Sequence, residues 1–421
     1  MKKSFFLKIC LLLAISARAD SPTTNALESP TALVQEALGH NTEIRFFEAE
    51  IQAARASRKT AALLPRPEIT GTLGQKRSHD PVGVSSGEGV AWSVGVSQTF
   101  EWPGRLGLRR AIANQDVTLA ELGLARFQAA LASSVRGKAH ALAAANERAH
   151  VAREVADRFH ALREVMIQRD PAGIAPQLEL RVLEATELTL RRKAADAELA
   201  TGNARLALNQ LTGRAIDRPL ETSLAESNLG DAPSLAALME IAQTNNFELR
   251  LRTAELEQQG FRVRLTRNER WPAFSVGPHL TEETAGVQDR IVGIGISFPL
   301  PLWKNTSANV EVARARQMQA QALLDTTQRE ITRRIASALV TFETKKHESA
   351  QWQPESIKAF ADAAELADRH FRLGAVPTTT YIELQKQYLD AVETLLETRR
   401  ETILSAAELE ELTGINLLGT P

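Results

Sequence analysis

Eight histidines are the residues of this 421-residue chain best suited to bind a metal or to transfer a proton at neutral pH, but their spacing does not gather them. No two lie four residues apart, the spacing that puts two histidines on one helix face. His140, His150 and His160 follow one another at intervals of ten residues, which advances about 280° around a helix, so they do not share a face. We therefore predict that the protein is not an enzyme, binds no cofactor and holds no resident metal.

The composition is typical of long helices and argues against a nucleic-acid partner. Lys plus Arg number 50 against 51 for Asp plus Glu, so the chain lacks the basic excess of a nucleic-acid binder. Aromatic residues make up only 5%, while alanine, leucine, glutamate and arginine are frequent, as in packed helices. The length would suffice for two or three ordinary domains.

Residues 1–19 have the features of a cleaved secretory signal. The basic pair Lys2–Lys3 precedes an apolar run over Phe5–Ile15, and residues 17–19 read Ala-Arg-Ala, as at a signal peptidase site. The run is shorter than the ~20 apolar residues needed to span a bilayer, which makes a membrane anchor the weaker alternative. Cleavage would remove Cys10, the only cysteine, and leave 46 basic against 51 acidic residues. We expect an exported, mildly acidic chain without disulfides.

The sequence repeats itself at a separation of about 200 residues. Asn41–Arg45 (NTEIR) returns as Asn246–Arg250 (NFELR), and Val94–Ser97 (VGVS) returns as Ile294–Ser297 (IGIS). Four further residues return 201 positions later, namely Gly173, Pro176, Thr212 and Gly213 as Gly374, Pro377, Thr413 and Gly414. We predict a first repeat over residues 20–214, a linker over 215–232 and a second repeat over 233–421.

Each repeat is predicted to contain a helix, two short strands, a very long helix, a turn and a second long helix. From about Gly104 to Gln168 the chain has no proline, and such a helix would be roughly 100 Å long at ~1.5 Å per residue. Apolar residues recur there at intervals of seven, as at Val117, Leu124 and Leu131, which is coiled-coil spacing. From the helices alone, a soluble coiled coil is an open alternative.

The strands, expected within about 67–100 and 271–300, favour a membrane protein. Along Val90–Phe100 large apolar side chains alternate with small or polar ones, and Val292–Phe298 repeats the pattern. A barrel strand that faces lipid on one side and a water-filled lumen on the other shows this alternation over ~10 residues, although a half-buried strand of a soluble sandwich does too. Tryptophan settles at the membrane–water interface. The candidate membrane-interface aromatics are Trp102, Trp271 and Trp303.

Four strands per chain cannot close a barrel, because barrels begin at about eight strands. An open strand edge in lipid would leave backbone groups unpaired at a cost of several kcal/mol each. The chain must therefore form oligomers if its strands enter a bilayer. Two copies would provide about eight strands and three copies about twelve, and the residues themselves allow either.

The order of elements and two strand-to-helix segments resemble the TolC-type outer membrane efflux proteins, most of all the CzcC-like heavy-metal-efflux branch. The segments are Ser97–Arg105 (SQTFEWPGR) and Gly295–Trp303 (GISFPLPLW). The resemblance implies a homotrimer with a 12-stranded outer-membrane β-barrel, continued by a periplasmic α-helical barrel. It also implies contact with outer-membrane lipid, a periplasmic adaptor (membrane fusion) protein and an inner-membrane efflux pump of the resistance-nodulation-division type.

The resemblance further implies a periplasmic tip where pairs of long helices turn. The candidate turn residues are Gly173, Pro176, Gly374 and Pro377, with Pro377 where Ser or Thr is common in the family. The candidate tip acids lining the pore are Glu179 and Glu383. In a trimer Glu383 would form a ring of carboxylates that favours cations. The alternatives are a solvated helix face or a pair with Lys386 three residues along.

These features predict a passive exit duct of a tripartite efflux system in the outer membrane, which exports metal ions or small toxic compounds. One alternative is the periplasmic adaptor of such a system, but the sequence shows no paired half-motifs of a lipoyl-like domain. Another is a secreted coiled-coil protein, which would leave the alternating strands unexplained.

Overall fold

A computed structural model describes residues 27–79, 81, 83, 85–169, 177–222, 230–300, 306–351, 354–415 and 417, so the predicted signal over 1–19 lies outside the described residues. The elements of the first half are α1 (Pro30–His40), α2 (Thr42–Ala61), β1 (Glu68–His79), β2 (Ser85–Phe100), α3 (Arg105–Arg169) and α4 (Gln177–Thr212). Those of the second half are α5 (Leu235–Asn245), α6 (Phe247–Asn268), β3 (Phe274–Ala285), β4 (Val287–Ser297), α7 (Thr306–Gln351), α8 (Pro354–Arg372) and α9 (Thr378–Thr413).

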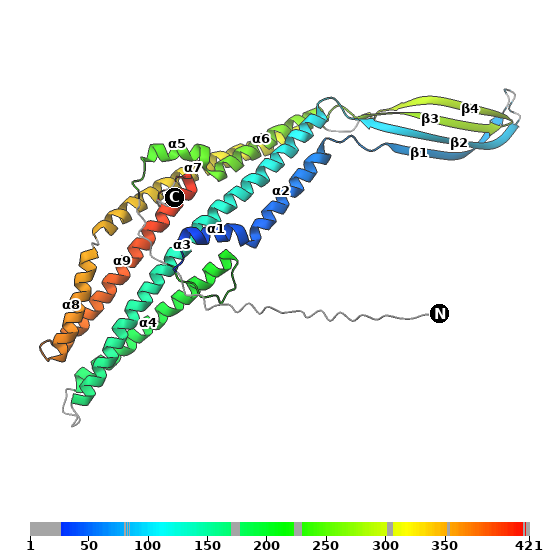
Figure 1. Ribbon diagram of the computed structural model, residues 1–421. Helices are drawn as coiled ribbons and strands as arrows, with labels where there is room; N and C mark the ends of the chain where they lie inside the picture. Colours follow the sequence, from blue (N-terminus) through cyan, green and yellow to red (C-terminus); the bar gives the residue numbers. More distant parts are fainter. Residues whose placement is uncertain are drawn as a thin grey trace, which may run out of the picture.

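The molecule is an elongated body of helices with a four-stranded sheet projecting from one end (Figure 1). The helix pairs α3–α4 and α8–α9 reach the opposite end, far from the sheet (Figure 1). In the described part of the chain, no helix is both long and apolar enough to cross a membrane. The sheet therefore forms one end of the elongated molecule and the ends of these helix pairs form the other. α3 and the shorter helices packed beside it connect the two ends.

Each strand pair is preceded by two helices, where the sequence predicted one, because an asparagine caps a new helix in each repeat. Asn41 lies between α1 and α2, and its Oδ1 accepts a hydrogen bond from the backbone N–H of Glu43 at 2.8 Å. Asn246 lies between α5 and α6, and its Oδ1 accepts from the backbone N–H groups of Glu248 and Leu249, both at 3.0 Å. The repeated Asn-x-Glu motif is therefore a pair of helix N-caps.

The same asparagines tie helix starts to helix ends. Asn41 Nδ2 donates to the carbonyl of Leu211 at 3.1 Å, and Asn246 Nδ2 donates to the carbonyl of Leu412 at 3.0 Å. These carbonyls belong to the last turns of α4 and α9, where C=O groups lack partners within the helix. As a result α2 begins beside the end of α4, and α6 begins beside the end of α9. Each of these two helix pairs runs alongside a longer helix.

Replacing Asn246 by alanine is expected to destabilise the protein by about 2 kcal/mol, since it removes an N-cap and leaves the Leu412 carbonyl without its donor in a buried site. Asn203, which is exposed on α4, provides the control, because its replacement by alanine should change stability little. Thermal loss of the helical circular dichroism signal would measure both variants. Equal midpoints for the two would contradict the capping role.

The first long helix is confirmed as α3, with 65 residues. The prediction of an equally continuous helix in the second repeat is wrong, because the chain forms α7 and α8 with residues 352–353, which lie outside the described residues, between them. α8 begins at Pro354. Proline has no N–H and clashes with the preceding turn, so it interrupts a helix but fits at the first position of a new one.

The four strands form one antiparallel sheet in the order β1-β2-β3-β4. β1 and β2 form one hairpin and β3 and β4 another, and β2 pairs with β3 to join them. The strands expected within 67–100 and 271–300 are confirmed at 68–100 and 274–297. β1 and β4 are the two edges of the sheet.

Buried side chains hold the helices together in three groups rather than in one centre. A group around Phe159 and Tyr381 joins α3, α4, α8 and α9. A second around Ile335 joins α5, α7 and α9, and a third around Leu142 joins α1, α3 and α4. Each helix thus buries its apolar stripe against its neighbours, as in a wall of helices rather than a closed globule.

Candidate functional site

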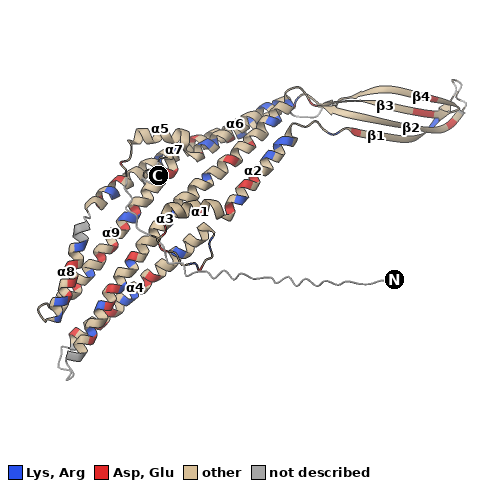
Figure 2. Cartoon of the chain, viewed as in Figure 1, with Lys and Arg blue, Asp and Glu red and all other residues tan. Residues whose placement is uncertain are grey.

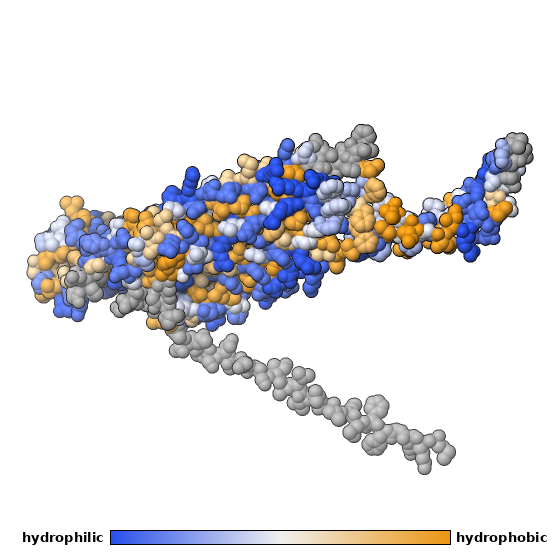
Figure 3. Space-filling view, turned by 90° about the horizontal axis from the view of Figure 1, so that it is seen from above, coloured by the Kyte–Doolittle hydropathy of each residue, from blue (hydrophilic) through white to orange (hydrophobic). Residues whose placement is uncertain are grey.

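One face of the sheet is apolar and exposed. The register places Ile69 opposite Val96 and Leu280 opposite Val292, and directly opposed residues share a face. The side chain of Ile69 is 78% exposed and that of Val292 is 77% exposed. Other exposed members of this apolar face are Leu73, Val94, Phe100, Ile294 and Ile296. Figure 3 shows hydrophobic residues gathered over the sheet and its joint with the body, so the alternation predicted from the sequence is confirmed.

The opposite, polar face carries small hydroxyl side chains that bond across the strands. The hydroxyls of Thr72 and Ser93 lie 2.7 Å apart, and those of Thr99 and Ser275 lie 2.9 Å apart. Near the end remote from the helices, Lys76 Nζ lies 2.7 Å from Glu283 and 3.6 Å from Asp289. Most charged residues of the strands gather at that end (Figure 2). One face of the sheet thus suits lipid and the other suits water.

Two of the three candidate interface tryptophans meet where the sheet joins the helices. The rings of Trp102 and Trp271 are stacked, with centroids 5.1 Å apart and planes 15° apart. The guanidinium of Arg270 lies 5.1 Å from the Trp271 ring centroid, a cation–π contact. Both indoles remain partly exposed, and their contact with a bilayer surface stays a prediction. The third candidate, Trp303, lies outside the described residues.

Arg105 holds this joint together from inside. In the sequence it stands out only as the last residue of the Ser97–Arg105 segment. Its side chain is buried, and its guanidinium donates to Asn268 Oδ1 at 3.1 Å, to the Asn268 carbonyl at 3.2 Å and to the Trp271 carbonyl at 2.6 Å. Asn268 Nδ2 in turn donates to the carbonyl of Pro103 at 3.0 Å. We call Trp102, Arg105, Asn268 and Trp271 the collar. It joins the start of α3 to the end of α6.

The candidate turn of the second repeat lies at the far end of the body (Figure 1). Gly374 has a φ of 76°, a left-handed backbone that favours glycine, and it follows the last turn of α8. Pro377 has an extended backbone and precedes α9 as its N-cap residue. The chain therefore turns between α8 and α9 at these residues, and their place at a periplasmic tip stays a prediction. The counterparts in the first repeat, Gly173 and Pro176, lie outside the described residues.

The two candidate tip acids lie near this turn in different environments. Glu179, in the first turn of α4, accepts a hydrogen bond from Thr378 Oγ1 at 2.8 Å. α9 has no side-chain cap of its own, and a carboxylate beside its first turn complements the partial positive charge there. Glu383 is exposed and accepts from Gln387 Nε2 at 2.8 Å. Among the ion pairs of the described residues, none joins Glu383 to Lys386.

Tyr381 anchors the same end of the body. It is fully buried, with ring centroids 5.3 Å from Phe159 on α3 and 5.0 Å from Phe371 on α8. Burial, more than the nearby Asp368 carboxylate, raises the pKa of the Tyr381 phenol, so the hydroxyl stays neutral and donates to Asp368 Oδ1 at 3.3 Å. Asp368 also pairs with Arg372 at 2.9 Å. This packing holds α3, α8 and α9 in register at the turn.

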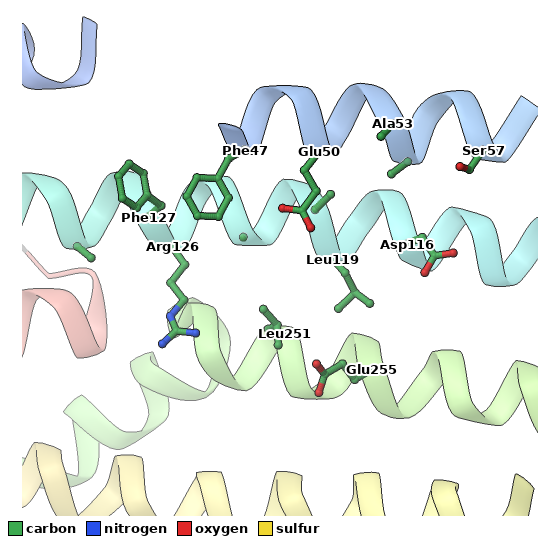
Figure 4. A pocket seen from close by; sticks show the side chains of 14 residues that line it. Phe47, Glu50, Ala53, Ser57, Asp116, Leu119, Arg126, Phe127, Leu251 and Glu255 are labelled. Carbon is green, nitrogen blue, oxygen red and sulfur yellow. The ribbon is translucent and has the colours of Figure 1, made fainter. Parts of the chain in front are cut away.

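A cavity of about 760 Å³ opens between α2, α3 and α6 (Figure 4). The rings of Phe47 and Phe127 are stacked at one end of it, with centroids 4.8 Å apart. Two of its acids are engaged, since Asp116 accepts from Gln258 at 2.5 Å and Glu255 accepts from Arg252 at 3.0 Å. Glu50 and Arg126 also line this cavity between the three helices.

Two spacings in the chain match known motifs by residue type alone. Gly83-x-Ser85-x-Gly87 has the glycines of a hydrolase nucleophile turn, but it lies in the hairpin between β1 and β2 rather than between a strand and a helix. Glu147-x-x-His150 has a spacing used by metal-binding helices. Within the described ranges, however, no three His, Cys, Asp or Glu residues are grouped so that they could hold a metal ion.

A sheet with one lipid-suited and one water-suited face, mounted on a long wall of helices, defines a membrane-embedded protein with an extended body. The model of the outer membrane efflux protein family matches residues 33–214 and 238–415, and the chain belongs to this family. It is an outer-membrane efflux protein of the TolC type, located in the outer membrane with an extension into the periplasm.

Solved structures of outer-membrane channels share the fold. The Campylobacter jejuni channel CmeC is 17% identical, with a TM-score of 0.75 over 92% of this chain and 86% of that one. The outer-membrane channel OprN is 16% identical, with a TM-score of 0.75 over 99% of both chains. The open Neisseria gonorrhoeae channel MtrE is 17% identical, with a TM-score of 0.69 over 91% of this chain and 88% of that one. The comparison with curated proteins finds no match.

Proposed function

We propose that three copies of this chain form the passive exit duct of a tripartite efflux system. In this assembly each chain consists of two tandem repeats, over 20–214 and 233–421, and each repeat contributes one hairpin to a 12-stranded barrel. The observation that carries the proposal is the exposed apolar face of the sheet opposite its polar face. A soluble protein would cover such a face with helices or with a second sheet.

The open edges of the sheet support assembly. β1 and β4 have neighbours on one side only within the described chain, and unpaired backbone groups in lipid cost several kcal/mol each. Pairing β4 of one copy with β1 of the next removes every edge once the ring closes. The tryptophans of the collar then lie at the periplasmic rim of the barrel, where indoles settle at the bilayer surface.

The other end of the body is proposed to receive the partners. We place the turns at Gly173–Pro176 and Gly374–Pro377 at the periplasmic tip, where a periplasmic adaptor protein docks and an inner-membrane pump of the resistance-nodulation-division type supplies the energy. The resemblance of the sequence to the CzcC-like branch supports metal ions, or else small toxic compounds, as the exported substrates. The duct itself performs no chemistry.

Cell fractionation and gel electrophoresis test the assembly directly. We expect the protein in the outer-membrane fraction, with a folded form that migrates differently before and after boiling. Chemical cross-linking of the purified protein should give a ladder that ends at three copies, and the protein should conduct ions in a planar bilayer. A soluble periplasmic protein without heat-modifiable mobility would overturn the proposal and favour the adaptor or coiled-coil alternative.

Replacing Glu383 by glutamine tests whether this acid lines the pore. The amide keeps an acceptor for Gln387 but removes one charge per chain, and we expect the preference for cations over anions to fall by roughly twofold. Asp362→Asn removes an exposed acid from α8 and is the matched control. Reversal potentials in a salt gradient measure both variants. If Glu383→Gln has the selectivity of the wild-type protein, Glu383 belongs to a solvated outer face.

A further inference from the structure

His279 is an ionisable side chain in the middle of the polar face of the sheet, where Ile291 of β4 is a second large side chain. It lies on β3, opposite Gly95 of β2 and Gly293 of β4. Opposed residues share a face, and the same face carries the hydroxyl pairs of Thr72 with Ser93 and of Thr99 with Ser275. The His279 side chain is half-buried although it lies on a face without a covering layer in the described chain.

Glycines make the space that the imidazole occupies. A Cβ added at Gly293 would lie 2.8 Å from His279 Cε1 and 3.1 Å from Nε2, closer than real Cβ contacts. At Gly295 it would lie 3.6 Å from Nδ1, and at Gly95 it would lie 3.3 Å from the His279 Cβ. The imidazole ring therefore packs against Gly293 and Gly295 of β4. Glycine weakens a strand, so this arrangement serves the ring and the open space above it rather than strand stability.

The ionisable neighbours of His279 on this face are few. From β2 and β4 its direct neighbours are glycines, flanked by serines and other residues without charge. On the same face of the described strands the charged residues are Glu68 near the helices and the cluster of Lys76, Glu283 and Asp289 near the other end. Glu283 is four residues along β3, ~13 Å away at strand spacing, which exceeds the screening length of physiological salt, about 8 Å.

Protonation of His279 would therefore change the net charge of the polar face substantially. The three carboxylates and one ammonium leave a formal net charge of −2 per chain with a neutral imidazole. A protonated imidazole reduces it to −1. Histidine side chains in general change charge between about pH 5 and 8.

We propose that His279 is a specificity-determining residue of the barrel lumen, whose protonation lowers the preference of the duct for cations. This inference rests on the proposed trimeric barrel, in which the polar face lines the water-filled interior. The ring lies against Gly293 and Gly295, so its charge is placed on the wall of the lumen. In a trimer three such side chains form a ring at one height, and rings of like residues control ion selectivity.

Reversal potentials of the purified, full-length protein in planar bilayers test the proposal, with a potassium chloride gradient at pH 7.5 and at pH 5.5. For the wild-type protein we expect the cation preference to fall by roughly twofold at the lower pH. His279→Phe keeps a ring over the glycines but no charge, and it should show the higher preference at both pH values. His279→Arg should show the lower preference at both.

Two further variants complete the design. His279→Gln is a second neutral variant in case the phenylalanine variant does not assemble, and His150→Gln, which changes an exposed histidine of α3, should keep the wild-type shift. A wild-type selectivity that ignores pH, or a neutral variant that keeps the shift, would overturn the inference while leaving the duct intact. Failure of the wild-type protein to conduct at all would overturn the proposed function itself.

Discussion

Replacing Arg105 by alanine is expected to lower the free energy of unfolding by about 3–5 kcal/mol, because it weakens the joint between the sheet and the helices. The guanidinium is buried and makes three hydrogen bonds, to the side chain and carbonyl of Asn268 and to the carbonyl of Trp271. Alanine leaves these acceptors unsatisfied and opens a cavity beneath the stacked tryptophans. Unfolding in urea, followed by the loss of heat-resistant mobility and by tryptophan fluorescence, should show a clearly lower midpoint.

Arg110→Ala is the matched control, because Arg110 is exposed one and a half turns further along the same helix. Its loss should cost little, as is usual for exposed charges. Arg105→Lys should lie between the two, since an ammonium keeps the charge but cannot span three acceptors as a planar fork does. If Arg105→Ala unfolds together with Arg110→Ala, the collar is held by its tryptophans and not by the arginine.

The strands and the first long helix could be predicted because their signals are local and periodic. In β2, residues of even number are large and apolar from Val90 to Val96, and a period of two is read directly from the sequence. In α3, the absence of proline over some sixty residues was enough to predict one continuous helix. The turn at Gly374 was predictable for the same reason, since glycine and a following proline mark a helix end.

The elements that the sequence did not reveal depend on contacts between distant residues. Asn41 and Asn246 look like ordinary polar residues inside a helical pattern, and only their bonds to Leu211 and Leu412 show why the helix restarts there. The role of Arg105 depends on acceptors more than 160 residues away. The division of the second long helix, by contrast, has a local signal in the sequence, because α8 begins at Pro354.

The pairing of β2 with β3 depends on a glycine, because Gly277 lies against the backbone of β2. A Cβ added there would lie 1.7 Å from the carbonyl oxygen of Val96 and 2.7 Å from the Cα of Ser97. These are backbone atoms, which cannot turn aside as a flexible side chain can. The register gives neither Gly277 nor the next residue, Pro278, a partner in β2, so the pairing of β2 with β3 is already interrupted at this point.

Replacing Gly277 by alanine is therefore expected to separate β2 from β3 over several residues and to prevent barrel assembly. β2–β3 is the one strand pairing in the described chain that joins the two hairpins into a four-stranded sheet. Without it, neither hairpin can bury its backbone groups in lipid, and several kcal/mol for each unpaired group, summed over several residues, exceeds the stability of an ordinary domain. The heat-modifiable form should be lost from the outer-membrane fraction.

Gly295→Ala is the matched control. Gly295 of β4 is the register partner of Gly277 of β3, so both glycines lie on the polar face. A Cβ there would meet its nearest neighbour, His279 Nδ1, at 3.6 Å, an ordinary contact. Gly295→Ala should therefore assemble as the wild-type protein does. Equal yields of heat-modifiable protein from both variants would show that β2 and β3 can separate locally without loss of the barrel, and that the close approach at Gly277 is not required.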